Sequence, residues 1–165
     1  MSPTQRDIFG QTAFHIAAKS GQVAVLRSLL DMLENPASVH DLTDKSGLTP
    51  LHWAAYEGHE GCVDILISML EHYPIKGSEF SPLHCAVAQD RDQCLILILS
   101  NFKESLVNLR DRKLRTLLHI AAYQNSVACF KVLLNNGAAI NLKDSHNRTP
   151  LMLASYMGHQ RIVGK

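Results

Sequence analysis

Nine histidines and four cysteines are the residues of this chain that could bind a metal ion or act as nucleophiles. Zinc holds its imidazole and thiolate ligands about 2–2.3 Å from the metal, so the ligands must converge on one point. Cys62, Cys94 and Cys129 each lie ten residues after a histidine that recurs along the chain. They therefore occupy one equivalent position in successive units, and packed helices are about 8–10 Å apart. We expect these cysteines to be buried packing residues, and we expect no metal site.

Nucleophilic catalysis would need a serine or cysteine paired with a base and an orienting acid. No such arrangement occurs at a recognisable spacing, and no glycine-rich loop could cradle a phosphate. The recurring histidines are His15, His52, His84 and His119. Their regular positions indicate hydrogen-bonded parts of a scaffold, and Cys85, next to one of them, is expected to be partly buried. We therefore expect neither an enzyme nor a cofactor.

The elements that position these histidines recur at regular intervals. Each histidine, and Met152 in the last copy, ends a similar tetrapeptide, and the five copies are separated by 37, 32, 35 and 33 residues. The copies are Thr12-Ala13-Phe14-His15, Thr49-Pro50-Leu51-His52, Ser81-Pro82-Leu83-His84, Thr116-Leu117-Leu118-His119 and Thr149-Pro150-Leu151-Met152. This period and this tetrapeptide resemble the ankyrin repeat, and the resemblance covers nearly the whole chain.

The repeated pattern has a physical explanation in each unit. Thr or Ser caps a first helix, Pro suits the first helical position, and the His can reach back to the cap. Six positions after the His stand Gly21, Gly58, Asp90, Asn125 and Gly158. These residue types tolerate the left-handed backbone of a helix end. A second apolar helix follows in each unit, and the units must stack because one alone cannot bury its apolar face.

The pattern predicts an all-α fold, an ankyrin-repeat α-solenoid of about five helix-turn-helix repeats with β-hairpin-like loops on one edge. The predicted repeats are 7–43, 44–75, 76–110, 111–143 and a truncated fifth at 144–165, whose end is too short for a second helix. An array cut in this way exposes an apolar end face. We expect a monomer, with association through such exposed ends as the alternative.

Composition limits the compartment and the partners. The 165 residues carry 16 Lys and Arg against 15 Asp and Glu, a net charge of +1, whereas nucleic-acid binding needs an excess of cations. The longest aliphatic run, 95–99, is far shorter than the roughly 20 residues of a membrane span. Residues 1–7 do not resemble a secretion signal, and four cysteines without a C-x-x-C pair fit a reducing compartment. We expect an intracellular protein, cytoplasmic or nuclear, without nucleic-acid or membrane partners.

Function is expected on the concave face of the stack, which hairpin tips and first helices build together. In the ankyrin family the fourth and fifth residues after the histidine point to this face. The resulting candidates are Tyr56, Glu57, Gln89, Tyr123, Gln124 and Tyr156. Three of the four tyrosines share one repeat position, and Tyr is enriched at binding hot spots. Ordinary half-exposed packing is the alternative, and Trp53 is expected in the core.

A second candidate surface lies on the tips of the fourth and fifth repeats. Its cationic residues are Arg110, Arg112, Lys113, Arg115, Lys143 and Arg148, with His146 beside them. This positive lobe predicts docking of an acidic partner segment, and a solvated basic turn is the simpler alternative. Nucleic acid is the least favoured ligand, because the charge is balanced and no aromatic residues are interleaved.

Three loops depart from the repeat pattern. The third tip reads Lys76-Gly77-Ser78-Glu79-Phe80 in place of the expected Asp and Gly, which predicts a shortened hairpin. The first loop, 35–40, is longer than its counterparts and is a candidate contact point. Leu114 stands where the fourth tip would carry Gly, so we expect strain in that turn.

Two stretches show a narrower resemblance. Residues 44–56, DKSGLTPLHWAAY, and residues 80–86 with Asp90-Arg91 resemble consecutive repeats of the long ankyrin-repeat regulatory subunits of protein phosphatase 6. The first repeat, Leu114 and Leu117 fit less well and indicate a divergent relative or another family. The resemblance implies a scaffold that brings regulatory partners to a serine/threonine phosphatase. A structural spacer within a longer array, with no partner site of its own, remains the competing hypothesis.

Overall fold

The computed structural model describes residues 2–70, 80–102 and 106–164. Within these ranges the chain forms α-helices and one 3-10 helix, and an isolated antiparallel bridge between Arg110 and Thr116 stands in place of a sheet. The elements are α1 (Ala13–Lys19), α2 (Val23–Asp31), η1 (Pro36–Asp41), α3 (Pro50–Glu57), α4 (Glu60–Ile67), α5 (Pro82–Ala88), α6 (Asp92–Asn101), α7 (Leu117–Gln124), α8 (Val127–Asn135), α9 (Pro150–Met157) and α10 (Gln160–Val163).

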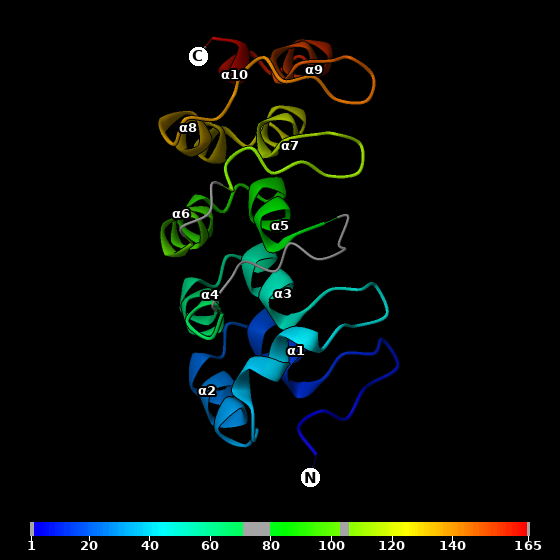
Figure 1. Cartoon of the computed structure of the whole chain (residues 1–165), viewed down its shortest axis with the longest axis vertical. Helices are drawn as coiled ribbons and strands as arrows, with labels where there is room; N and C mark the ends of the chain where they lie inside the picture. Colours follow the sequence, from blue (N-terminus) through cyan, green and yellow to red (C-terminus); the bar gives the residue numbers. More distant parts are fainter. Residues whose placement is uncertain (1, 71–79, 103–105, 165) are drawn as a thin grey trace.

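The helices stack as five pairs, which confirms the predicted all-α solenoid. Figure 1 shows the first helices of the pairs in one layer, the second helices in another, and the connecting loops projecting from the side of the first layer. Tips that are neighbours in the stack are joined through their backbones. The Lys45 amide donates to the Phe9 carbonyl at 3.0 Å, and the Ser145 amide donates to the Lys113 carbonyl at 2.9 Å.

The recurring histidines act as predicted at the start of each first helix. The backbone amides of the cap residues Thr12, Thr49, Ser81 and Thr116 donate to Nδ1 of the histidine three residues later, at 3.1–3.3 Å. Because Nδ1 accepts, the ring proton must sit on Nε2, which is then free to donate elsewhere. Left-handed residues end these helices or follow their last turn: Gly21, Gly58, Asp90, Asn125 and Gly158.

The core runs between successive repeats. The residue before each recurring histidine is fully buried in the first four repeats, and these residues are Phe14, Leu51, Leu83 and Leu118. The paired small residues beside them, Ala54 and Ala55 for example, are also fully buried and let neighbouring helices approach closely. Leu151, the counterpart in the fifth repeat, is 51% exposed at the end of the described stack. An apolar end face is therefore present on α9.

The irregular segments differ in part from expectation. The long first loop folds into η1, where the side chain of Asn35 accepts from the Ala37 amide. Residues 76–79 of the third tip lie outside the described residues, while Phe80 is half-buried with its ring centre 5.8 Å from that of His84. The prediction that the fifth repeat lacks a second helix was wrong, because α10 forms one turn and buries Ile162. No described helix is long and apolar enough to cross a membrane.

Candidate functional site

Each described hairpin tip is built around one aspartate. Oδ1 of Asp44 accepts from the amides of Ser46 and Leu48, two and four residues further on, and the same pair of bonds recurs at Asp7, Asp111 and Asp144. Three residues after each aspartate the backbone is left-handed, at Gly10, Gly47, Leu114 and Asn147. Leucine is the exception in this set, and a left-handed backbone costs an L-residue about 1–2 kcal/mol. Leu114, at which the sequence predicts strain, has a φ of 57° and so adopts this unfavourable left-handed backbone.

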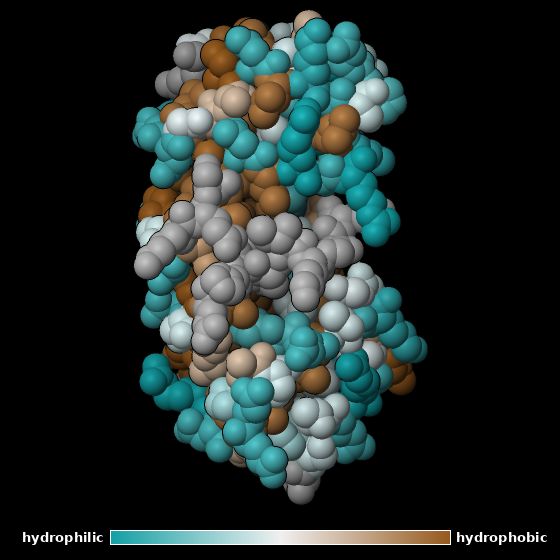
Figure 2. All heavy atoms as spheres, in the orientation of Figure 1, coloured by the Kyte–Doolittle hydropathy of each residue, from teal (hydrophilic) through white to brown (hydrophobic). Residues whose placement is uncertain are grey.

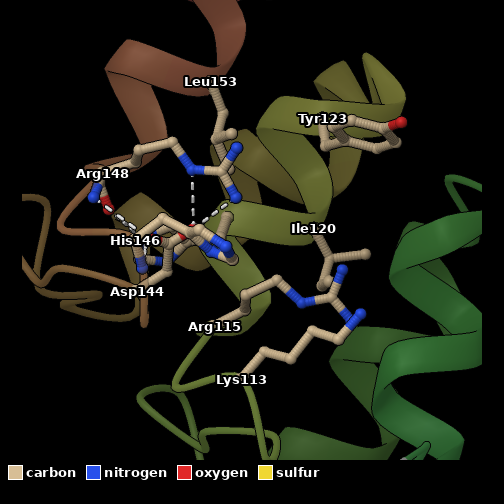
Figure 3. A pocket seen from close by; sticks show the side chains of 9 residues that line it. Lys113, Arg115, Ile120, Tyr123, Asp144, His146, Arg148 and Leu153 are labelled. Carbon is tan, nitrogen blue, oxygen red and sulfur yellow. Dashed lines mark hydrogen bonds and ion pairs between the residues drawn. The ribbon is translucent and has the colours of Figure 1, made fainter.

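A hollow of about 260 Å³ opens where the fourth and fifth tips meet α7 and α9. Figure 3 shows the side chains that line it, which are Lys113, Arg115, His119, Ile120, Tyr123, Asp144, His146, Arg148 and Leu153. Its apolar part comes from Ile120, Leu153 and the ring of Tyr123, and its polar part comes from the two tips. We call this hollow the groove. Figure 2 shows that the surrounding edge of the molecule is mostly hydrophilic.

The arginines of the groove are not free charges. Arg115 pairs with Asp111 at 2.7 Å, and Arg148 pairs with Asp144 at 2.8 Å. Burial opposes ionisation of Asp144, but hydrogen bonds from the Arg148 side chain and the tip amides outweigh it and lower its pKa to about 2. Both arginines therefore stabilise their own tips. Asp111 and Asp144 neutralise part of the positive charge that the sequence predicts for this surface.

Lysine supplies the accessible charge. Lys113 is exposed and makes no ion pair among the described residues, and it reaches the groove beside Arg115. Arg110 donates to the carbonyls of Leu114 and Lys143 and so joins the fourth tip to the fifth. A carboxylate entering the groove would meet Lys113 on the rim and apolar side chains below it. Such a site suits an acidic peptide segment that also carries an apolar residue.

A smaller hollow of about 160 Å³ adjoins the groove and shares two of its residues. It is lined by Phe80, Asp111, Arg112, Lys113 and Arg115. Four predicted site residues, Arg112, Lys113, Arg115 and Arg148, thus lie around two neighbouring hollows, and Tyr123 joins them from α7. The other predicted site residues, Glu57, Gln89, Gln124, Tyr56 and Tyr156, line neither hollow.

An aromatic cluster on the second repeat was not predicted. Trp53 is only half-buried, whereas Cys85, Ile120 and Leu153 at the same repeat position are buried. Its indole N–H donates to Oδ2 of Asp44 at 2.9 Å, and the Lys19 amino group lies 4.3 Å from the ring centre. The core role expected for Trp53 was therefore wrong. Burial at this repeat position varies, since Ile16 in the first repeat is 47% exposed.

Tyr56 belongs to this cluster. Its ring meets the Trp53 ring edge-on with centres 6.1 Å apart, and 38% of the residue is exposed. Tyr123 and Tyr156, at the same repeat position, are 47% and 85% exposed. The exposed tyrosines are thus spread over three repeats. The clue in the sequence was Trp53 itself, the only tryptophan, at a position that small and aliphatic residues occupy elsewhere.

The buried cysteines carry no reactive thiol. All four are buried, Cys85 more completely than expected. Burial raises the pKa of the Cys85 thiol to about 12 and that of Cys94 to about 11. Among the described residues, no group of three or more His, Cys, Asp or Glu side chains could hold a metal ion.

The comparisons with known proteins agree with the repeat architecture of the structure. The profile of ankyrin repeats (three copies) matches residues 2–76, 33–111 and 83–164. The chain is 28% identical over 93% of its length to the B-cell lymphoma 3 protein homolog of Mus musculus. It is 33% identical over 78% to the putative E3 ubiquitin-protein ligase XBAT31 of Arabidopsis thaliana, and 37% identical over 92% to inversin of Canis lupus familiaris. It spans 34%, 30% and 14% of the lengths of these relatives.

Proposed function

Because the chain belongs to the ankyrin-repeat family, we propose that it is a non-enzymatic scaffold that binds partner proteins through its concave face and hairpin tips. The observation that supports this most directly is the groove, which an exposed Lys113 lines together with the apolar side chains of Ile120 and Leu153. We propose that the groove takes an acidic segment of a partner. The contact extends from the groove along the concave face. It involves Tyr123 at the groove and, along the face, Tyr56, Glu57, Gln89, Gln124 and Tyr156.

Affinity capture from a cell lysate with mass spectrometry tests this proposal. Lys113→Glu reverses the charge at the groove, and Lys131→Glu makes the same change at an exposed site on α8. Reversing a charge on the rim of an interface is expected to weaken capture by about tenfold, since 1.4 kcal/mol corresponds to a factor of ten. Partners that bind wild type and Lys131→Glu but not Lys113→Glu would support the groove. Equal capture by both variants would refute it.

The aromatic side of the face needs a separate variant. A folded Tyr56→Ala, Tyr123→Ala, Tyr156→Ala triple variant removes the exposed rings while leaving the tips unchanged. If the tyrosines are hot spots, the triple variant loses the same partners that the charge reversal loses. If capture is unchanged, these rings serve packing only.

The structural-spacer hypothesis remains the second candidate, and one observation favours it. Arg115 and Arg148 are engaged by aspartates of their own tips, so part of the basic surface is used to hold the turns. A spacer predicts that no partner is lost in either variant while the fold is retained, so the same capture experiment separates the two functions.

We further propose a specific setting for the scaffold. The resemblance of residues 44–56 and 80–86 to regulatory subunits of protein phosphatase 6 supports a role as a scaffolding subunit of a serine/threonine phosphatase complex. Phosphatase subunits among the proteins captured by wild type are the expected result, and their absence from a set that contains other groove-dependent partners would refute this setting.

We also propose that the protein is a monomer in the cytoplasm or nucleus. We propose that its repeats are divided at 7–43, 44–75, 76–110, 111–143 and 144–165.

A further inference from the structure

Two kinds of side-chain hydrogen bond join neighbouring repeats at three of the four junctions. In the first kind, Nε2 of the recurring histidine donates to the carbonyl just before the next cap residue. His15 reaches Leu48 at 3.0 Å, His52 reaches Phe80 at 2.7 Å, and the same bond joins His119 to Arg148 at 2.9 Å. These bonds occur at the junctions of repeats one and two, two and three, and four and five.

In the second kind, the residue just before a second helix donates to a carbonyl in the last turn of the first helix of the preceding repeat. His59 donates to the Lys19 carbonyl at 3.0 Å, and His159 donates to the Tyr123 carbonyl at 3.0 Å. At the junction of the second and third repeats, Arg91 donates through Nε to the Tyr56 carbonyl at 3.3 Å. The same three junctions thus carry both kinds of bond.

Among the residues that the structure describes, the junction between the third and fourth repeats carries neither kind. Nε2 of His84, the equivalent donor, has no hydrogen-bond partner there although the residue is 2% exposed. Ser126 stands where the other repeats place His59, Arg91 and His159, and its hydroxyl is likewise buried without a partner. A serine is too short to reach the carbonyl that a histidine or arginine reaches. Two buried polar atoms are therefore left unsatisfied at one junction.

Two different contacts partly replace the missing bonds, and one of them is the Cys129 thiol, which donates to the Ala86 carbonyl at 3.9 Å. Asp90 stands where the first two repeats have Gly21 and Gly58, and its carboxylate accepts from the amides of Ala128 and Cys129 at the start of α8, at 3.4 and 2.9 Å. At the junction of repeats four and five, Asn125 occupies the same position as Asp90, and His159 still reaches the Tyr123 carbonyl. The Asp90 contact joins the turn between α5 and α6 to the start of α8 but leaves the His84 donor unpaired.

We infer that the stack is divided at this junction into two bodies, α1–α6 and α7–α10, which separate there more readily than at the other three junctions. Opening the junction lets water reach the two unsatisfied atoms, so it recovers hydrogen bonds that the closed state lacks. In a repeat protein, stability is a sum of repeat terms and nearest-neighbour interface terms, so a weak interface uncouples the units on either side. The groove lies wholly on the second body, and the Trp53 cluster lies wholly on the first.

Urea unfolding with two probes tests this inference. Trp53 is the only tryptophan, so its fluorescence reports the first body, whereas far-UV circular dichroism reports all helices. We expect the two curves not to coincide, with circular dichroism showing an additional transition that fluorescence does not detect. Coincident curves for the wild-type chain, giving one midpoint, would overturn the inference.

A restoring variant assigns the effect to the junction. Ser126→His supplies the donor found at the other junctions, in reach of the Ala88 carbonyl by equivalence with His59 and Lys19, and the two midpoints should then move together. The reciprocal His59→Ser should weaken the first junction instead and lower the fluorescence midpoint. Separate curves that Ser126→His leaves unchanged would overturn the inference.

A second pair of variants covers the case in which Ser126→His does not fold. His→Asn keeps an acceptor near the position of Nδ1 but has no atom at the position of Nε2. His84→Asn loses no inter-repeat bond, whereas His52→Asn loses the bond to Phe80. His52→Asn should therefore lower the fluorescence midpoint much more than His84→Asn does, and equal losses would overturn the inference.

Discussion

Leu114 allows a quantitative test of how the tips are built. Its φ of 57° places an L-residue in the left-handed region, at the position that Gly10 and Gly47 fill in the first two tips. The side chain is 47% exposed, so replacing it removes some packing as well as strain. Comparing Leu114→Gly with Leu114→Ala separates the two effects, because both variants lose the same side-chain contacts.

The expected difference follows from two opposing terms. The left-handed backbone costs alanine about 1–2 kcal/mol, which glycine avoids. Glycine loses about 0.5–1 kcal/mol through the greater freedom of its unfolded chain. Leu114→Gly should therefore have a higher free energy of unfolding than Leu114→Ala, by up to about 1.5 kcal/mol and centred near about 0.75 kcal/mol, measured by urea denaturation followed by circular dichroism.

The neighbouring tips supply matched controls. A Cβ at Gly47 would meet no atom within 4 Å, so Gly47→Ala should lower the free energy of unfolding only by the backbone difference between glycine and alanine given above. A Cβ at Gly10 would lie 2.9 Å from the Lys45 backbone nitrogen, so Gly10→Ala should cost more than Gly47→Ala. If Leu114→Gly is less stable than Leu114→Ala, the turn is not strained and the reasoning fails.

Three further predictions concern buried groups. Burial lowers the pKa of His52 and of His84 to about 4, so the unfolded chain binds more protons between that value and about 6.5. Stability should be complete above pH 6.5 and fall as the pH is lowered toward 4, by about 3 kcal/mol per histidine, and urea midpoints that stay constant over this range would contradict it. Burial raises the pKa of the Cys129 thiol, so a thiol reagent at pH 8 should modify it only after unfolding, as mass spectrometry would show. Asp44→Asn should cost about 1–2 kcal/mol and change the Trp53 fluorescence spectrum, because the indole loses its charged acceptor, and an unchanged spectrum would contradict the contact.

Local sequence signals predicted the repeated elements well. The cap residue, the histidine three residues later and the left-handed residue at the helix end all act within one turn of the chain, so their chemistry can be read directly from residue types. The burial of Cys62, Cys94 and Cys129 followed from their common register. The all-α stack then followed, because each unit exposes an apolar face that only a neighbouring unit can cover.

The candidate site was predicted only in part. Tyr123, Lys113, Arg115 and Arg148, which the sequence predicts as partner-binding residues, lie around the groove. Their proposed binding role is a matter for the capture experiment. The pairing of both arginines with aspartates of their own tips was missed, because charge counted along the chain does not show which cations are already engaged.

The amino-acid sequence by itself determined the period, the caps at which the first helices begin and the family, because these depend on contacts between residues close in the chain. Only the tertiary structure decided which interactions join the repeats. Whether Nε2 of a histidine finds a carbonyl depends on a residue about 30 positions away. His84 and His119 accept the same bond from their cap residues, yet only His119 finds a carbonyl at Nε2. The exposure of Trp53 also depends on the packing of its neighbours. Local chemistry therefore specified the unit, and packing between units specified its surfaces and its weakest junction.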